Sequence, residues 1–287
     1  MDDAMRVKLW GVRGSIPVPG PASSGFGGNT SCVQVTSPDG TELILDAGTG
    51  IRELGVALMG RCQSMHILLT HLHLDHIQGL MFFAPLFDPT VEVTIWGPTS
   101  AARPLRDRLA RYISDPLSPI DIRDLPAQVR FEDALRPALR LGGIEVKSGF
   151  IAHRGPTLGY RLDSGTASIC YLPDHEPGLG ENLDTAEPAW ISGHTLASHA
   201  SLLIHDCQYE DHEYRIRRGW GHSSVSDALS FAHRADCAHT LMFHHDPAHN
   251  DTHLASLGAE VAERWTLLAG AGTIELAREG QVIDLPG

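Results

Sequence analysis

Short apolar runs recur along the chain and are separated by turns that are rich in glycine, proline and aspartate. Runs of this length, bounded by turn residues, predict β-strands. A last pair of runs, residues 272–276 and 281–285, predicts a closing hairpin. We expect the other strands, in chain order, at residues 7–10, 32–37, 42–45, 67–70, 91–96, 128–132, 144–150, 167–172, 201–204 and 239–243.

Other segments place apolar residues at the spacing of an α-helix. One helix is expected to begin at Asp75, because Ile77, Leu80, Met81 and Ala84 follow at that spacing. The other expected helices cover residues 51–59, 99–112, 226–235 and 253–265. The chain therefore predicts strands interrupted by helices, twice over.

The most informative polar cluster directly follows one of these strands and reads T-H-L-H-L-D-H-I-Q-G. It contains His71, His73, Asp75 and His76. His71 and His73 lie on the same side of an extended segment. Capping of a helix explains Asp75 alone. Four candidate ligands are too many for one catalytic ion, which keeps one position open, so they indicate two metal ions for ester or phosphodiester hydrolysis.

This His-x-His-x-Asp-His pattern after an apolar strand resembles the signature of the metallo-β-lactamase superfamily. The resemblance implies an α+β fold, an αββα sandwich of two packed mixed sheets with helices outside. It would form a single domain over residues 1–287, with two repeated halves at about 1–165 and 166–287. In the superfamily, an Asp-x-Gly element like the one at Asp46 orients the metal loop.

Later segments resemble the tRNase Z and phosphodiesterase branch of the superfamily. His153, ahead of Gly159-Tyr160-Arg161, is similar to the third ligand segment. Asp174, at a strand end, resembles the bridging carboxylate. The resemblance implies that His71, His73 and His153 hold the first ion and Asp75, His76 and His244 the second, with Asp174 between them and His245 as the alternative to His244.

Two further segments resemble tRNase Z elements that pair near the leaving group. The segment His205-Asp206-Cys207-Gln208 is similar to His-Glu-Ala-Thr, with Asp206 in place of the glutamate. The segment Gly221-His222-Ser223-Ser224 is similar to His-Ser-Thr, although a serine here could also cap the next helix. The resemblance implies that His222, steadied by Asp206, binds substrate and assists catalysis together with Asp75.

A loop rich in proline and glycine near the amino end leads to Asn29. Asn29 or the neighbouring glycine amides could contact the substrate at the mouth of the site. An ordinary turn is the alternative, since glycine and asparagine favour turns. The segment alone does not decide between the two.

The formal net charge of −13 affects the choice of substrate. Sequence-blind binding of nucleic acid depends on cations that neutralise phosphates, so nucleic acid is disfavoured. We expect a small phosphodiester of the cyclic nucleotide type, attacked by a hydroxide that the two ions share. The alternatives are tRNA 3′ processing, hydrolysis of a lactone, thioester or β-lactam, and a metal-containing binding or sensing module without turnover.

The remaining expectations concern cofactors and location. Zinc is the default for the histidine-rich set, but sites of mixed nitrogen and oxygen ligands also accept Mn or Fe. The five scattered cysteines indicate reduced thiols. The sequence shows no signal region and no apolar run that is long enough to span a membrane, so we expect a cytoplasmic protein. The family resemblance implies a possible homodimer.

Overall fold

The computed structural model describes residues 4–136, 139–179 and 181–287. In this part of the chain, the strands form two seven-stranded sheets, ordered β14-β1-β2-β3-β4-β5-β6 and β13-β12-β11-β10-β9-β8-β7. The first sheet contains β1 (Met5–Gly11), β2 (Cys32–Thr36), β3 (Glu42–Leu45), β4 (Ser64–Leu68), β5 (Glu92–Gly97), β6 (Gln128–Asp133) and β14 (Val282–Leu285). The second contains β7 (Leu139–Leu141), β8 (Ile144–Phe150), β9 (Leu158–Ser164), β10 (Ala167–Leu172), β11 (Leu202–Asp206), β12 (His239–Phe243) and β13 (Thr273–Leu276).

Both sheets follow the same plan. Strands β14 to β3 are antiparallel and strands β3 to β6 are parallel. In the second sheet, strands β7 to β10 are antiparallel and strands β10 to β13 are parallel. Parallel neighbours present their carboxyl ends at one edge, so residues that follow such strands come close together in space.

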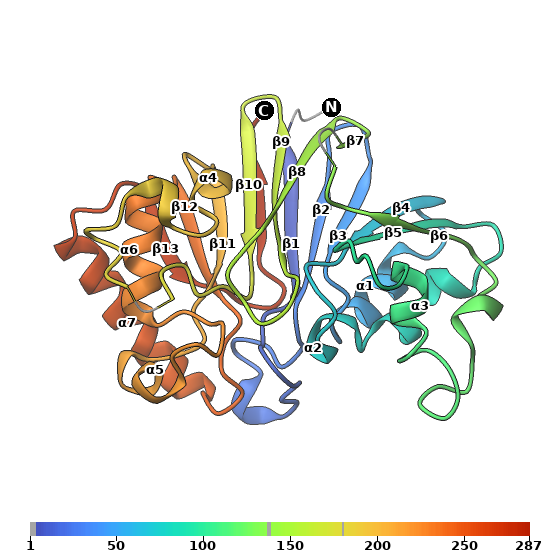
Figure 1. Cartoon of the computed structure of the whole chain (residues 1–287), viewed down its shortest axis with the longest axis horizontal. Coiled ribbons are helices and arrows are strands. Elements are labelled where there is room, and N and C mark those ends of the chain that lie inside the picture. Colours follow the sequence, from blue (N-terminus) through green and yellow to red (C-terminus); the bar gives the residue numbers. More distant parts are fainter. Residues whose placement is uncertain (1–3, 137–138, 180) are drawn as a thin grey trace.

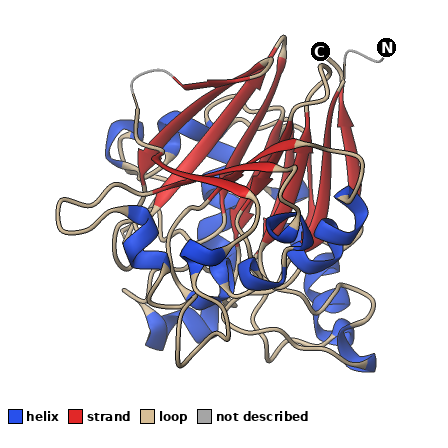
Figure 2. Cartoon of the chain, turned by 90° about the vertical axis from the view of Figure 1, so that its right-hand side faces the viewer, coloured by secondary structure: helices blue, strands red, loops and turns tan. Residues whose placement is uncertain are grey.

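Helices cover the outer face of each sheet (Figures 1 and 2). Figure 1 shows α1 and α3 beside the first sheet, and α6 and α7 beside the second. The helices are α1 (Ile51–Leu58), α2 (Leu74–Ile77), α3 (Leu105–Leu109), α4 (His194–Ala197), α5 (Asp211–Arg217), α6 (Val225–Ala235) and α7 (Asp251–Leu267). The expected αββα sandwich with mixed sheets and outer helices is confirmed.

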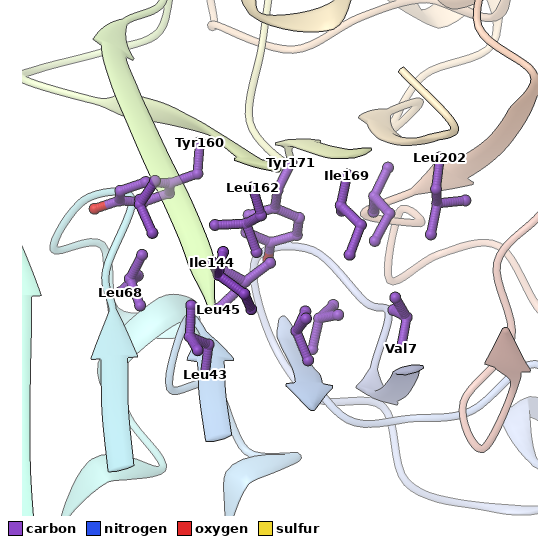
Figure 3. Close-up of a cluster of buried hydrophobic side chains, with 14 of the residues drawn as sticks. Val7, Leu43, Leu45, Leu68, Ile144, Tyr160, Leu162, Ile169, Tyr171 and Leu202 are labelled. Atoms are coloured by element: carbon purple, nitrogen blue, oxygen red, sulfur yellow. The ribbon is translucent and has the colours of Figure 1, made fainter. Parts of the chain in front are cut away.

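The main core lies between the two sheets (Figure 3). Val7, Leu43 and Leu68 of the first sheet belong to the same buried cluster as Leu162 and Ile169 of the second. Burying one such side chain stabilises the fold by about 1.5–3 kcal/mol. Two further buried clusters lie under the outer helices, so both faces of each sheet are covered.

Two predicted helices are shorter than expected. The helix predicted at 99–112 is restricted to α3, because Pro104 has an extended backbone and disfavours helical geometry in the residue before it. The helix predicted from Asp75 is the single turn α2, followed by two 3₁₀ turns. A Cβ at Gly79 would lie 2.1 Å from the carbonyl oxygen of Gly48, so a glycine is required where these two backbones meet.

The closing hairpin was a wrong prediction. Strand β13 pairs with β12 in the second sheet, whereas β14 pairs with β1 in the first. The connecting turn crosses between the sheets. In it, the Ala277 amide donates to the Met242 carbonyl at 2.8 Å and the Gly280 amide donates to the Leu9 carbonyl at 2.8 Å. The local pattern predicted both strands correctly but gave no information on their partners.

None of the five cysteines takes part in a disulfide, as expected for reduced thiols. Within residues 4–136, 139–179 and 181–287, no helix combines the length and the apolar character that are needed to cross a membrane.

Candidate metal and catalytic centre

The candidate residues lie where strands end. The segment 71–76 follows β4, His153 follows β8, Asp174 follows β10, Asp206 ends β11 and His244 follows β12. Figure 1 places α2, which carries Asp75 and His76, at the foot of the two sheets. Residues that are far apart in the sequence therefore converge at one edge of the sandwich.

Asp174 joins two groups of side chains. One group is His71, His73, His153 and Asp174, the other is Asp75, His76, His244 and Asp174, and the candidate ligand atoms of each group lie within 4.8 Å of one another. Oδ2 of Asp174 is 3.6 Å from Nε2 of both His71 and His153. Oδ1 is 2.9 Å from His76 Nε2 and 3.3 Å from His244 Nε2. Opposite oxygens of one carboxylate thus face the two groups.

Several atoms at this junction have no hydrogen-bond partner. In the described part of the chain, His71 Nε2, His76 Nε2 and Asp174 Oδ1 are buried and unpaired, and the 2.9 Å approach of His76 to Asp174 lacks hydrogen-bond geometry. Buried polar atoms rarely go unpaired without an ion or water at the site. Imidazole nitrogens and carboxylate oxygens are the donors that zinc accepts, so these residues fit two divalent ions.

The histidines of the first group also favour ligation by their protonation state. Burial lowers the pKa of His71 well below its ordinary value, and it lowers the pKa of His73 and His153 as well. A metal ligand must be the neutral imidazole. The surroundings therefore favour the form that binds a metal.

Asp46 orients two of the candidate ligands from behind. His76 Nδ1 lies 2.8 Å from Asp46 Oδ2, and the amide and hydroxyl of Thr70 also donate to this carboxylate. The Thr70 hydroxyl lies 3.0 Å from His71 Nδ1, and the Tyr171 hydroxyl donates to Asp46 at 3.1 Å. Ligating imidazoles need their second nitrogen held. This placement agrees with the supporting role that the Asp-x-Gly resemblance implies.

Asp206 accepts hydrogen bonds from four donors. His222 Nδ1 lies 2.6 Å from Oδ2. The backbone amides of His175, Gln208 and Ser223 donate to the same carboxylate at 3.0–3.1 Å. Asp206, His222 and His244 also come within 4.8 Å of one another, but these donors already occupy the oxygens of Asp206. We therefore treat Asp206 as the partner of His222 and not as a metal ligand.

His222 lies beside both groups. Its ring centroid is 5.0 Å from that of His244 and 4.9 Å from that of His153. Burial alone would lower the pKa of His222, but the Asp206 carboxylate outweighs burial and raises the pKa to about 9. Because Nδ1 faces Asp206, Nε2 is the nitrogen that is left to meet a substrate.

Glu176 holds the loop that precedes His222. This buried carboxylate accepts hydrogen bonds from the Tyr214 hydroxyl at 2.7 Å and from the amides of Gly219 and Gly221 at 2.8 Å. The Gly221 carbonyl in turn lies 2.6 Å from His153 Nδ1. Glu176 therefore fixes a segment that orients His153 and leads directly into His222.

The structure adds a contact that the sequence analysis missed. The Ser15 amide donates to Asp75 Oδ2 at 2.7 Å, and a Cβ at Gly14 would lie 2.5 Å from the ring of His244. The signal was the Gly-x-x-Gly-Ser run that interrupts the first strand. The sequence analysis above assigned no role to this run, which occupies residues 11–15.

Two predicted residues lie elsewhere. The Asn29 side chain donates to Glu279 at 2.7 Å and accepts from the Thr49 hydroxyl at 2.9 Å. Within the described residues, none of its hydrogen bonds goes to the histidine groups, so its contact with substrate stays a prediction. His245, the alternative to His244, directs Nε2 to the Ala277 carbonyl at 2.8 Å. The structure thus brings His244 to the second group.

Known proteins resemble this chain in sequence over most of its length. The family model described as the beta-lactamase superfamily domain matches residues 41–245. A protein named Ribonuclease Z from Kineococcus radiotolerans is 24% identical, covering 86% of this chain and 87% of the relative. Another Ribonuclease Z, from Mycobacterium avium, is 29% identical and the match covers 95% of both chains.

Solved structures share the fold. The metallo-beta-lactamase fold protein YhfI from Bacillus subtilis has a TM-score of 0.70 and 17% identity, over 98% of this chain and 100% of that one. Zinc-bound PqqB from Methylobacterium extorquens has a TM-score of 0.69 and 15% identity, with the same coverage. The short form of human tRNase Z has a TM-score of 0.65 and 21% identity, again with the same coverage.

Proposed function

The chain belongs to the metallo-β-lactamase superfamily, in its tRNase Z-like branch, and from that premise we propose that it cleaves phosphodiester bonds in RNA with two divalent metal ions. In general terms, the chain is a metal-dependent hydrolase of the phosphodiesterase type. The observation that carries the proposal is Asp174, whose two oxygens face two separate groups of histidines.

The proposed ligands of the ions are the residues of these two groups. His71, His73 and His153 would hold one ion, Asp75, His76 and His244 the other, and Asp174 would bridge them. When bound, such ions lower the pKa of water and offset negative charge on phosphate oxygens. We propose zinc for both positions from the nitrogen-rich donor set.

The chain's own residues then position the reacting groups. Asp75 is held by the Ser15 amide and by His244. Although burial opposes its charge, His76 and His244 lower the pKa of Asp75, so its carboxylate can accept a hydrogen bond from the attacking water. His222, kept protonated by Asp206, can give the proton on Nε2 to the leaving oxygen.

RNA as the substrate is supported by the relatives and by a local basic segment. Helix α5 ends with Arg215 and Arg217, and the following loop carries Trp220, which is 54% exposed and lies two residues before His222. Arg154 reaches the same loop through the Gly219 carbonyl. Exposed aromatic rings beside cations bind unpaired nucleotides by stacking. The sequence analysis placed a small cyclic nucleotide first and tRNA second; the names of the relatives favour the reverse order.

A small phosphodiester remains the second candidate because of the overall charge. The chain has 22 lysines and arginines against 35 aspartates and glutamates. Such a surface repels a long polyanion outside the segment near His222. A cytoplasmic location and a homodimer also stay predictions.

A substrate panel tests the proposal. Zinc-loaded protein would be assayed on a precursor tRNA with a 3′ trailer, on cyclic mononucleotides, on bis(p-nitrophenyl) phosphate and on a lactone. We expect cleavage of the precursor tRNA at the trailer, with kcat/KM falling steeply as salt is added. Faster turnover of a cyclic mononucleotide with little salt dependence would favour the second candidate over RNA. Activity on the lactone alone would contradict the proposed phosphodiesterase activity.

A further inference from the structure

A third group of possible metal ligands lies outside the centre described above. It consists of Glu210, His249 and His253, whose candidate ligand atoms lie within 4.8 Å of one another. Glu210 is the residue that caps α5, His249 lies in the segment between β12 and α7, and His253 is in the first turn of α7. Three residues from two distant stretches of the chain therefore meet at one point.

The two histidines face each other. Their rings stack with centroids 4.2 Å apart and an angle of 18° between the planes. Because the ring planes are close to parallel, one ring would turn about its χ2 angle for both histidines to direct a nitrogen at the same ion.

Carboxylates complete the surroundings of the pair. Glu210 Oε1 lies 2.8 Å from His253 Nε2, and Glu213 Oε1 lies 3.2 Å from His249 Nε2. Two imidazoles and a carboxylate are a donor set that zinc takes, with ligand bonds of about 2.0–2.2 Å. His249 is 94% buried, whereas the side chains of His253 and Glu210 are 40% and 24% exposed, so the ion would bind where a fixed, buried ring meets the surface.

The site also lies at a structural junction. The buried guanidinium of Arg13 donates to the carbonyls of His249, Asp246 and Gly27. Asp251, at the start of α7, accepts from the amides of Gly25 and Phe26. The segment that carries both histidines is thus fixed to the amino-terminal loop, while Glu210 caps α5.

We propose that Glu210, His249 and His253 bind a third zinc ion, which joins α5 to the start of α7. Glu213 would orient His249, in the way that carboxylates commonly orient ligating histidines. The role is structural, because the ion would join two segments that are far apart in the sequence and would touch no residue of the two proposed catalytic groups. This inference goes beyond the proposed function and does not depend on it.

Metal content measured with zinc alone tests the site. The full chain, wild type and His253→Gln, would be equilibrated with a small excess of Zn²⁺, freed of unbound ion and analysed for zinc per chain. We expect three ions in the wild type and two in His253→Gln, with kcat on bis(p-nitrophenyl) phosphate unchanged within about twofold. His253 is partly exposed, so the substitution should not prevent folding.

His199→Gln is the matched control. His199 is also exposed and faces one carboxylate, Asp236, at 3.2 Å, but it belongs to no group of candidate ligands among the described residues. The control should retain three ions. The inference is overturned if His253→Gln holds as much zinc per chain as the wild type, whatever the number of ions in the catalytic groups.

A second variant, Glu210→Gln, removes the carboxylate ligand and should also reduce the content to two. Loss of zinc from the catalytic groups instead, seen as loss of activity with the third ion retained, would count against the proposed function and not against this site.

Discussion

Two buried aspartates, each at the end of a strand in a different sheet, hold two histidines by the same kind of hydrogen bond but with different consequences. Asp46 follows β3 and accepts from His76 Nδ1, whereas Asp206 ends β11 and accepts from His222 Nδ1. Each also accepts backbone amides or hydroxyls from its neighbours. Both carboxylates are fully buried. Each histidine is therefore held in the same way, by a buried carboxylate at its Nδ1 atom.

The difference lies in where the far nitrogen of each histidine leads. The His76 side chain is fully buried and its Nε2 faces Asp174, inside the second group. The His222 side chain is 12% exposed and lies beside both groups. One aspartate therefore holds an imidazole that should stay still on a metal ion, and the other holds an imidazole that can exchange a proton with a substrate. The surroundings, and not the pair itself, set the role.

The largest effect should come from the residue that both regions share. Asp174→Ala removes the carboxylate that faces both groups and should release zinc from both positions. Two bound metal ions supply several kcal/mol of transition-state stabilisation. Because 1.36 kcal/mol corresponds to a tenfold change in rate, kcat should fall by roughly 10⁴-fold. Zinc analysis and kcat on bis(p-nitrophenyl) phosphate would be measured together.

The control for this variant is Asp184→Ala, which removes an exposed aspartate that belongs to no group of candidate ligands among the described residues and should retain zinc and rate. If Asp174→Ala retained its full zinc content and its full rate, Asp174 would not be the bridging ligand.

The next effect separates the two histidines. His222→Ala should keep its full zinc content but lose at least about 10²-fold in kcat, the usual contribution of general acid catalysis. His76→Ala should lose zinc as well as rate, since it removes a ligand. If His222→Ala also released the catalytic zinc, His222 would belong with the ligands and the comparison would fail.

A smaller effect compares the aspartates directly. Asp46→Asn should weaken zinc binding by roughly 10–100-fold, as is usual when the group that orients a ligand is changed. Asp206→Asn should leave zinc binding intact and lower kcat by roughly 10–100-fold, because a hydrogen bond to a charged group contributes about 1.5–3 kcal/mol. Zinc titrations and saturating kinetics on both variants would test this difference.

Equal loss of zinc affinity in the two variants would show that both aspartates orient residues that bind zinc. Circular dichroism and Tm would first establish that each variant is folded, since both positions are buried.

The same two regions show how far the sequence alone predicts the site. His71, His73, Asp75 and His76 stand in one short run, so their type and spacing were sufficient to predict a metal cluster. Asp206 and His222 are sixteen positions apart, and only a family resemblance connected them.

Contacts that depend on tertiary packing left no such pattern. Nothing local distinguishes Ser15, whose amide reaches Asp75, from other residues of a turn. The strands behaved in the same way: apolar runs predicted β13 and β14, yet their partners are set by packing between the sheets. The third group was overlooked because His249 and His253 meet Glu210 only in the folded chain.

The smallest predicted effect concerns Glu176, which connects the two regions through one loop. In Glu176→Gln, one carboxylate oxygen becomes an amide nitrogen, which cannot accept from the amide of Gly221. The loop that carries His222 and orients His153 should loosen, and kcat should fall about tenfold, the equivalent of one charge-assisted hydrogen bond. KM should change little, because the loop residues that would contact substrate are still present.

Tyr214→Phe is the matched control for Glu176, since it removes only the hydroxyl that donates to Glu176 and leaves both glycine contacts in place. It should retain kcat within about twofold while its Tm falls about as far as that of Glu176→Gln. A merely structural role for Glu176 predicts that kcat follows Tm in both variants. A positioning role predicts that kcat falls in Glu176→Gln alone. Only that substitution releases the backbone of Gly221, whose carbonyl orients His153 and which directly precedes His222.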